Sequence, residues 1–420
     1  MVEAPLLRFG LADGRPATLL LGEAATVLSV DETLVSSWDL SGRPYALVRD
    51  EGTYRRGLDG RLLHKREATA EGPRVRRRLF AADGEPVVEA ARREAQAALA
   101  ALATGGVEGD VLPRRAEDGS LALEEHPVPE AVRRLRLVAS LDEAALRADA
   151  ERFLAVCGRV GILPPDQYLS LAVRVTEGCS WNACTFCSLY RGIPFRAKDA
   201  AELRAHVRAL QGYFGASLAL RRSVFLGDAN ALCLAEERLL PLLEVVAAEL
   251  PGAPLFSFVD AWTGARKTGA EWRACARLGL RRVYVGLETG DPALLSWLGK
   301  PGSREDAVDL VLSLRDAGVA AGVIVLVGAG GRRFADAHVA ATARALTLMR
   351  LGPDDLVYFS ELLEEPGLEY GLRAADEADL HPLEPAACAR QRAAILSAFH
   401  ARDPARPPRV ATYDIRELVY

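Results

Sequence analysis

Residues 171–187 read LAVRVTEGCSWNACTFC, an apolar run followed by a cluster of three cysteines. The run from Leu171 to Val175 is apolar apart from one arginine, which is typical of a short buried strand. Cys179, Cys184 and Cys187 then fall within nine residues. In parallel α/β sheets the ligand site lies beyond the carboxyl ends of the strands, so the cysteines stand where chemistry is expected.

Three thiolates at this spacing can hold three corners of a 4Fe-4S cluster, because thiolates are the usual ligands of its irons. No fourth cysteine lies close by in the sequence, which leaves one iron open for chemistry. Zinc is disfavoured because it needs four ligands and no second paired Cys or His motif appears. Three alternatives stay open: an enzyme, an iron–sulfur binding or electron-transfer protein, and a degenerate fold kept for protein interaction.

Downstream of Ser170, apolar strand-like runs alternate with helical stretches. Such runs are typical of parallel strands that are buried on both faces, and the alternation predicts right-handed crossovers. Six units are fewer than the eight of a closed barrel. We therefore expect an α/β fold with a partial (β/α)6 TIM-like barrel over residues 168–370. The predicted strands are 171–175, 223–226, 255–259, 282–287, 321–327 and 355–359, and the predicted helices are 200–211, 235–250, 269–278, 304–317 and 335–350.

Two further regions flank this barrel. Residues 1–157 are predicted to form an additional N-terminal α+β domain of unknown role, with short antiparallel strands up to about residue 65 and a helix at 87–103. Residues 105–141 carry few regular signals and are expected to be a linker or an irregular excursion. Asp142 is predicted to cap a second helix, 143–156. Residues 371–420 are expected to be a small C-terminal helical extension, with a helix at 385–400.

Composition excludes several classes of protein. The net charge of −5 over 420 residues gives no argument for binding nucleic acid. The N-terminus lacks the layout of a signal peptide, and no apolar run is long enough for a membrane span. Seven cysteines, three of them clustered, fit a reducing compartment, so a cytoplasmic protein is expected.

The cysteine run resembles that of the radical S-adenosylmethionine (radical SAM) superfamily. Its spacing, C-x4-C-x2-C, is one residue longer in the first gap than the usual family spacing, C-x3-C-x2-C. The aromatic residue before the last cysteine is kept as Phe186. The form of the run is similar to that of an uncharacterised subgroup of the superfamily.

Three later segments carry the same resemblance at the ends of predicted strands. Gly227 and Asp228 match the family segment whose backbone binds the SAM amino group. Glu288 matches the residue near the SAM ribose, and Gly328 lies in a glycine segment similar to the one that passes the adenine. The resemblance covers roughly residues 168–370.

The resemblance implies one 4Fe-4S cluster on the three cysteines, with SAM chelated to the open iron. Reductive cleavage of SAM would give a 5'-deoxyadenosyl radical that abstracts hydrogen from an unknown small-molecule or peptide substrate. An external electron donor of the flavodoxin or ferredoxin type and sensitivity to oxygen are expected with it. Asp228, Asp260 and Lys300 are possible substrate-binding residues, although structural roles are more common for such side chains.

The remaining cysteines and one histidine are given no role in binding or chemistry. Cys157, Cys233, Cys275 and Cys388 are isolated and are expected to be small core residues. They therefore do not predict a second cluster. His338 is expected on the surface of a helix.

Overall fold

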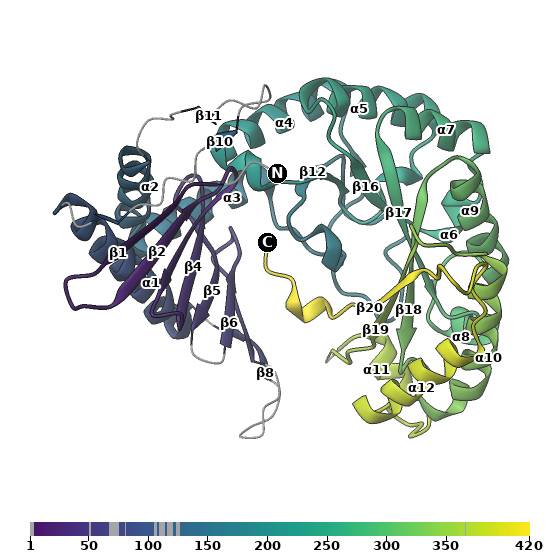
Figure 1. The fold of residues 1–420 in the computed structure, drawn as a ribbon. Coiled ribbons are helices and arrows are strands. Elements are labelled where there is room, and N and C mark those ends of the chain that lie inside the picture. The colour runs from purple at the N-terminus through teal and green to yellow at the C-terminus, as the bar shows by residue number, and fades with distance from the viewer. Residues whose placement is uncertain are drawn as a thin grey trace. The chain divides into compact units, whose positions relative to one another are not determined.

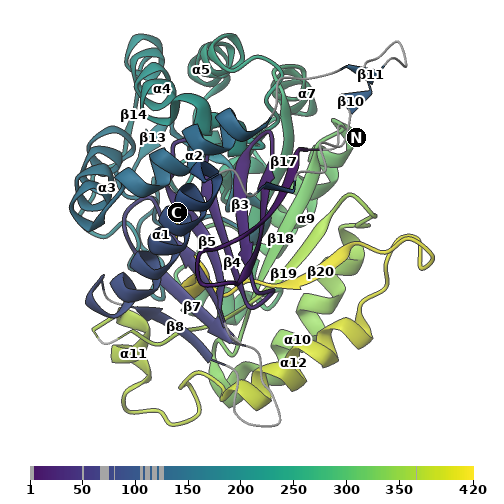
Figure 2. The same cartoon turned by 60° about the vertical axis from the view of Figure 1, so that its left-hand side comes forward.

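The computed structural model describes residues 4–49, 52–66, 75–79, 81–104, 107–108, 114–115, 121–122, 127–365 and 367–420. The chain divides into two compact units (Figures 1 and 2). Unit 1 comprises residues 1–159, 209–222 and 416–420, and unit 2 comprises residues 160–208 and 223–415.

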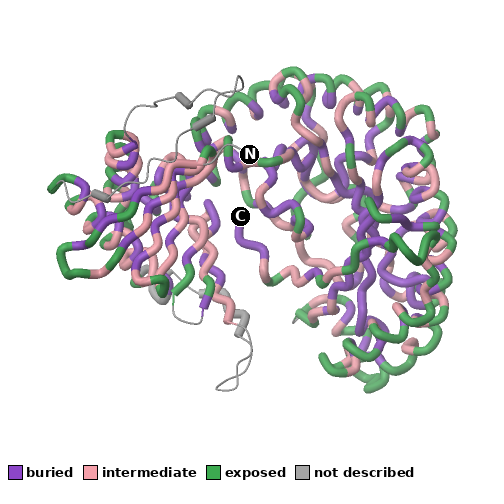
Figure 3. The backbone as a smooth tube through the Cα atoms, viewed as in Figure 1, coloured by how far each residue is buried: buried purple, intermediate pink, exposed green. Residues whose placement is uncertain are grey.

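Unit 1 is built on a nine-stranded sheet in the order β8-β7-β6-β5-β4-β3-β2-β1-β9, and its strand pairs are antiparallel. This confirms the predicted short antiparallel strands. Along several strands buried residues alternate with more exposed ones, as a sheet with one covered face requires (Figure 3). The strands are β1 (Leu6–Gly10), β2 (Pro16–Leu21), β3 (Ala25–Val30), β4 (Leu34–Asp39), β5 (Pro44–Arg49), β6 (Gly52–Arg56), β7 (Leu62–Arg66), β8 (Val75–Leu79) and β9 (Val107–Glu108).

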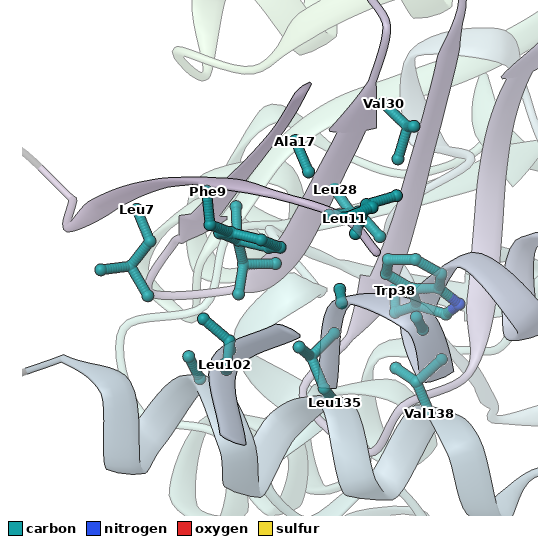
Figure 4. Close-up of a cluster of buried hydrophobic side chains, with 14 of the residues drawn as sticks. Leu7, Phe9, Leu11, Ala17, Leu28, Val30, Trp38, Leu102, Leu135 and Val138 are labelled. Atoms are coloured by element: carbon teal, nitrogen blue, oxygen red, sulfur yellow. The ribbon is translucent and has the colours of Figure 1, made fainter. Parts of the chain in front are cut away.

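The buried face of this sheet packs against two helices, α1 (Ala81–Ala103) and α2 (Val128–Ser140) (Figure 4). Trp38 of the sheet lies in the same apolar cluster as Leu102 of α1 and Leu135 and Val138 of α2. Helix α2 corrects the expectation that residues 105–141 are irregular. Its buried residues recur every three to four positions, which is the signal of an amphipathic helix. Much of residues 105–126 lies outside the described residues; β10 (Arg114–Arg115) and β11 (Leu121–Ala122) are short strands there.

Helix α3 (Glu143–Cys157) confirms the second predicted helix, and the carboxylate of its N-cap, Asp142, accepts a hydrogen bond from the Ala145 N–H. It also supplies a buried charge to unit 1. Both oxygens of the Asp149 carboxylate accept hydrogen bonds from Arg43, the shorter at 2.8 Å, and the Tyr213 hydroxyl donates to it at 2.8 Å. Burial disfavours the charged carboxylate, but Arg43, Tyr213 and Arg152 together outweigh burial and hold the pKa of Asp149 below its ordinary value.

Removing the charge of Asp149 should destabilise unit 1, because Arg43 would stay buried with its main partner lost. We expect Asp149→Asn to lower the free energy of unfolding by about 3 kcal/mol. Glu143→Gln is the matched control, because Glu143 pairs with Arg147 on the exposed face of the same helix. Denaturant unfolding measures both variants, and equal losses would contradict the importance of the buried pair.

Unit 2 is built on a seven-stranded parallel sheet in the order β12-β15-β16-β17-β18-β19-β20. Six of its strands lie where strands were predicted. Strand β20 was not predicted, because its sequence, Arg-Val-Ala-Thr, is short and has no continuous apolar run. In the structure its residues are mostly exposed. The strands are β12 (Leu171–Arg174), β15 (Val224–Gly227), β16 (Leu255–Val259), β17 (Leu280–Glu288), β18 (Ala320–Val327), β19 (Leu356–Glu361) and β20 (Arg409–Thr412).

Helices cover the outer face of this sheet, so the parallel sheet with its helices forms the α/β arrangement of an open, TIM-like partial barrel (Figure 1). The central strands are buried almost throughout, as parallel strands with covered faces must be. The helices that follow strands are α4 (Ala200–Phe214), α5 (Glu236–Glu249), α6 (Ala261–Gly264), α7 (Gly269–Arg277), α8 (Pro292–Trp297), α9 (Arg304–Asp316), α10 (Gly331–Leu348), α11 (Glu369–Ala374) and α12 (Pro385–Ala398). Among the described residues, none of the helices combines the length and apolar character needed to cross a membrane.

Candidate functional site

The cysteine loop leaves the carboxyl end of β12 and is closed by a small antiparallel pair, β13 (Thr176–Glu177) with β14 (Arg196–Ala197). Arg191 organises the loop from within. Its guanidinium donates hydrogen bonds to the carbonyls of Asn182, Cys184 and Cys187 at 2.8, 2.8 and 3.2 Å. One exposed side chain therefore fixes the backbone beside two of the three cysteines.

Asn182 lies in the longer first gap of the cysteine motif. Its φ of 51° is in the left-handed region, which asparagine tolerates better than most residues. Its side chain donates to the Tyr190 carbonyl at 2.9 Å, and its N–H points to the sulfur of Cys179 at 3.4 Å. The extra residue is thus held by specific hydrogen bonds.

A second anchor of the loop comes from the segment that follows α8. The Trp181 indole N–H donates to the Gly299 carbonyl at 2.8 Å. The backbone N–H of Thr185 donates to the Leu298 carbonyl at 2.9 Å. This segment continues directly into Lys300, so the loop and that lysine are held together.

One cavity of about 230 Å³ lies at the carboxyl ends of the strands. Five residues predicted for the site line it: Cys179, Cys184, Cys187, Phe186 and Glu288. Two of the possible substrate-binding residues, Asp260 and Lys300, line it as well. Gly227, Asp228 and Gly328 do not contribute to its wall.

Glu288 and Lys300 form a largely buried ion pair in the cavity wall. Lys300 Nζ lies 2.8 Å from Glu288 Oε1, and the two side chains are 9% and 15% exposed for Glu288 and Lys300 respectively. Burial alone would lower the pKa of Lys300, but the charge and hydrogen bond of Glu288 and the charges of Cys184 and Asp260 together outweigh burial and raise that pKa above its ordinary value. The lysine therefore stays charged next to the cysteines.

The thiols of Cys184 and Cys187 are largely buried and lie near the charge of Lys300. Burial raises the pKa of Cys184 to about 11 although Lys300 opposes the shift, and burial also raises the pKa of Cys187. Iron binding must therefore displace protons from neutral thiols. No three His, Cys, Asp or Glu residues in the described part of the chain converge on a single metal ion. A 4Fe-4S cluster takes one thiolate at each of several irons, so three separated thiols on one cavity wall fit a cluster.

Gly227 and Asp228 lie beside the base of the cysteine loop. The Gly227 carbonyl accepts a hydrogen bond from the Val175 N–H at 2.9 Å. The Asp228 carboxylate accepts from the Gly178 N–H at 3.2 Å and lies 3.3 Å from Arg174 Nε. Burial raises the pKa of Asp228 above its ordinary value despite the arginine. In this structure these residues join β12, β15 and the start of the loop.

Gly328 lies at the end of β18, where its N–H donates to Gln391 Oε1 at 2.8 Å. Its φ of 83° favours glycine, and a Cβ there would lie 2.8 Å from Cys388 Sγ. It is thus enclosed by residues around α12. Its predicted place near the adenine stays a prediction.

His338 lies near the site, which the sequence did not reveal, and its expected position on a helix surface is wrong. It is fully buried, and its Nδ1 lies 2.7 Å from Thr289 Oγ1 and 3.2 Å from Thr342 Oγ1. Thr289 directly follows Glu288. The histidine therefore packs beneath the turn that presents the Glu288 carboxylate.

Cys233 also differs from its expected place in the core. It is half-buried, whereas Cys157, Cys275 and Cys388 are buried as expected. A hydrogen bond links its thiol to Ser180 of the cysteine loop. Ser180 in turn accepts from Asn230, which also donates to the Asp260 carboxylate. This polar chain joins the ends of β15 and β16 to the loop, and no sequence motif indicates it.

Comparison with known proteins gives one family match. A family model described as the radical SAM superfamily matches residues 173–346. Among solved structures, the radical S-adenosylmethionine methyltransferase TsrM from Kitasatospora setae is similar at a TM-score of 0.42 and 18% identity, covering 58% of this chain and 55% of TsrM. Coproporphyrinogen III oxidase (HemN) from Escherichia coli is similar at a TM-score of 0.41 and 16% identity, covering 61% of this chain and 54% of HemN. The chain thus spans little more than half the length of these proteins. No curated protein sequence matches it.

Adding a methyl group at Gly286 should disrupt the ion pair. A Cβ at this position would lie 2.6 Å from Lys300 Nζ and would also overlap the Glu288 carboxylate. We expect Gly286→Ala to lower the free energy of unfolding by about 1–3 kcal/mol. Gly212→Ala is the control, because a Cβ there meets nothing within 4 Å inside α4. Chemical denaturation compares them, and a Gly286→Ala protein as stable as the control would refute the crowding.

His338 should make stability depend on pH. Burial lowers its pKa from 6.5 to about 4, so the unfolded chain binds its proton before the folded protein does. Stability should therefore fall by about 3 kcal/mol as the pH drops from 6.5 to 4. Unfolding of His338→Gln across this range should show a shallower fall, whereas His400→Gln, at an exposed position, should follow the wild type. Identical pH profiles for all three proteins would contradict the buried neutral histidine.

Proposed function

We propose that the chain is an enzyme that cleaves SAM reductively, because residues 173–346 match the family model of the radical SAM superfamily. One observation carries the proposal: Cys179, Cys184 and Cys187 line a single cavity together with the Glu288–Lys300 pair. In this proposal the three cysteines hold one 4Fe-4S cluster.

When bound, the reduced cluster would supply the electron that splits a C–S bond of SAM and so gives the 5'-deoxyadenosyl radical that takes hydrogen from the substrate. The residues of the chain have separate tasks around this chemistry. Arg191 and Asn182 keep the loop backbone fixed, and Lys300 places a positive charge beside the thiolates. The apolar wall that includes Phe186 limits the access of water.

The SAM-binding residues are proposed on the same basis. Glu288 is proposed to bind the ribose, since its carboxylate borders the cavity beside the cysteines. Gly227 and Asp228 are proposed to present backbone groups to the SAM amino group from the neighbouring strand end, and Gly328 to approach the adenine. We further propose a cytoplasmic, oxygen-sensitive enzyme that takes its electron from a flavodoxin or ferredoxin.

Anaerobic reconstitution with iron and sulfide, followed by addition of SAM and a low-potential reductant, tests the proposal. The wild type should gain the absorbance of an iron–sulfur cluster and form 5'-deoxyadenosine. Cys179→Ala, Cys184→Ala and Cys187→Ala should each lose both, because each removes a thiolate that an iron requires. Cys157→Ala is the matched control, as Cys157 is buried in unit 1.

The two readouts separate the alternatives. A wild-type protein with a full cluster that forms no 5'-deoxyadenosine would be an iron–sulfur binding or electron-transfer protein. A wild-type protein that gains no cluster, although it is folded, would contradict both interpretations.

A further inference from the structure

Tyr413 lines the same cavity as the cysteines, and its hydroxyl is buried without a hydrogen-bond partner among the described residues. The residue follows β20, and its N–H donates to the Phe359 carbonyl at 2.8 Å. The side chain is 1% exposed. Because nearly all buried polar groups in native proteins are hydrogen-bonded, this hydroxyl calls for a partner that the described residues do not supply.

Two other tyrosines of the sheet have hydroxyls with hydrogen-bond partners, in contrast to Tyr413. The hydroxyls of Tyr284 and Tyr358 donate to the two oxygens of Asp166 at 2.6 and 2.7 Å. The Tyr358 ring lies 5.6 Å from the Tyr413 ring, so the contrast arises between neighbours. Burial raises the pKa of Tyr413 well above its ordinary value, and its hydroxyl therefore keeps its proton and acts as a donor.

The other residues that line the cavity limit which ligands can accept a hydrogen bond from the Tyr413 hydroxyl. Most of the wall is apolar, with side chains from Ile162, Phe258, Ile324, Leu326, Leu362 and Ile415. Lys300 is the single basic residue of the described lining, and Glu288 neutralises it. Asp260, Glu361 and Glu365 add carboxylates. A ligand with a negative charge would face repulsion and find no free cation.

We propose, resting on the proposed function, that Tyr413 binds the substrate by donating a hydrogen bond to a carbonyl-type acceptor. The substrate class is then a molecule with an apolar body and without negative charge. SAM would occupy the side of the cavity formed by the cysteines and Glu288. The phenol would hold the substrate from Tyr413, the residue after β20, which lies outside the segment matched by the family model.

Three fluorinated probes test this class on the full-length protein, reconstituted with its cluster and held without reductant. They are 4-fluorobenzamide, 4-fluorobenzoate and 4-fluorotoluene, and fluorine NMR measures their binding with and without SAM. The amide should bind the wild type and the benzoate should bind at least about ten times more weakly, because of the acidic lining. Tyr413→Phe should weaken the amide about 3–10-fold and leave the toluene unchanged, because only the amide loses a hydrogen bond.

Tyr358→Phe is the matched control, since it removes a neighbouring hydroxyl that is already bonded to Asp166 and does not line the cavity. It should leave the binding of the amide unchanged. Tyr413→Phe should also be at least as stable as the wild type, because it removes a buried hydroxyl that lacks a partner. A clear loss of stability would mean that the hydroxyl is already bonded and would overturn the proposal.

Two binding results would also overturn it: equal affinity of the amide for the wild type and Tyr413→Phe, or weaker binding of SAM to Tyr413→Phe. The second result would assign the hydroxyl to SAM. Formation of 5'-deoxyadenosine, measured in parallel after reductant is added, reports on the proposed function alone. The binding of the probes therefore fails or succeeds independently of SAM cleavage.

Discussion

The buried pair of Glu288 and Lys300 is the interaction on which the site depends. Two charges are retained away from water only when each keeps its partner and its place. Glu288 comes from the end of β17, and Lys300 from the segment whose carbonyls hold Trp181 and Thr185 of the cysteine loop. A shift of either charge would therefore disturb the sheet, the loop and the thiols together.

Much of the second unit could be predicted from sequence because its strands are buried on both faces. Continuous apolar runs such as 321–327 predict buried strands directly, and six strands of this sheet were predicted in this way. Strand β20 has no such run. It is a strand because it pairs with β19, and its own sequence does not indicate that pairing. Helix α2 was not predicted for a different reason. It follows a stretch with few regular signals, and several arginines lie between the few apolar residues of its buried face.

The site was predictable only where residues are adjacent in the sequence or carry a family motif. The three cysteines and Glu288 do line one cavity, as their positions after strands suggest. The contributions of Arg191, His338 and Tyr413 depend on approaches between distant segments, which no local pattern encodes. Asp228 shows the converse: a motif residue whose carboxylate serves the base of the loop.

The way the chain is divided between the two units determines whether cleavage of the backbone can separate them. The first unit includes residues 209–222, which comprise the end of α4 and most of the segment before β15, and also residues 416–420. The polypeptide therefore passes from one unit to the other four times, and no single cut releases either of them whole. Residues 416–420 follow residues 223–415 in the chain, so during synthesis the first unit still lacks these residues when the whole of the second has been made.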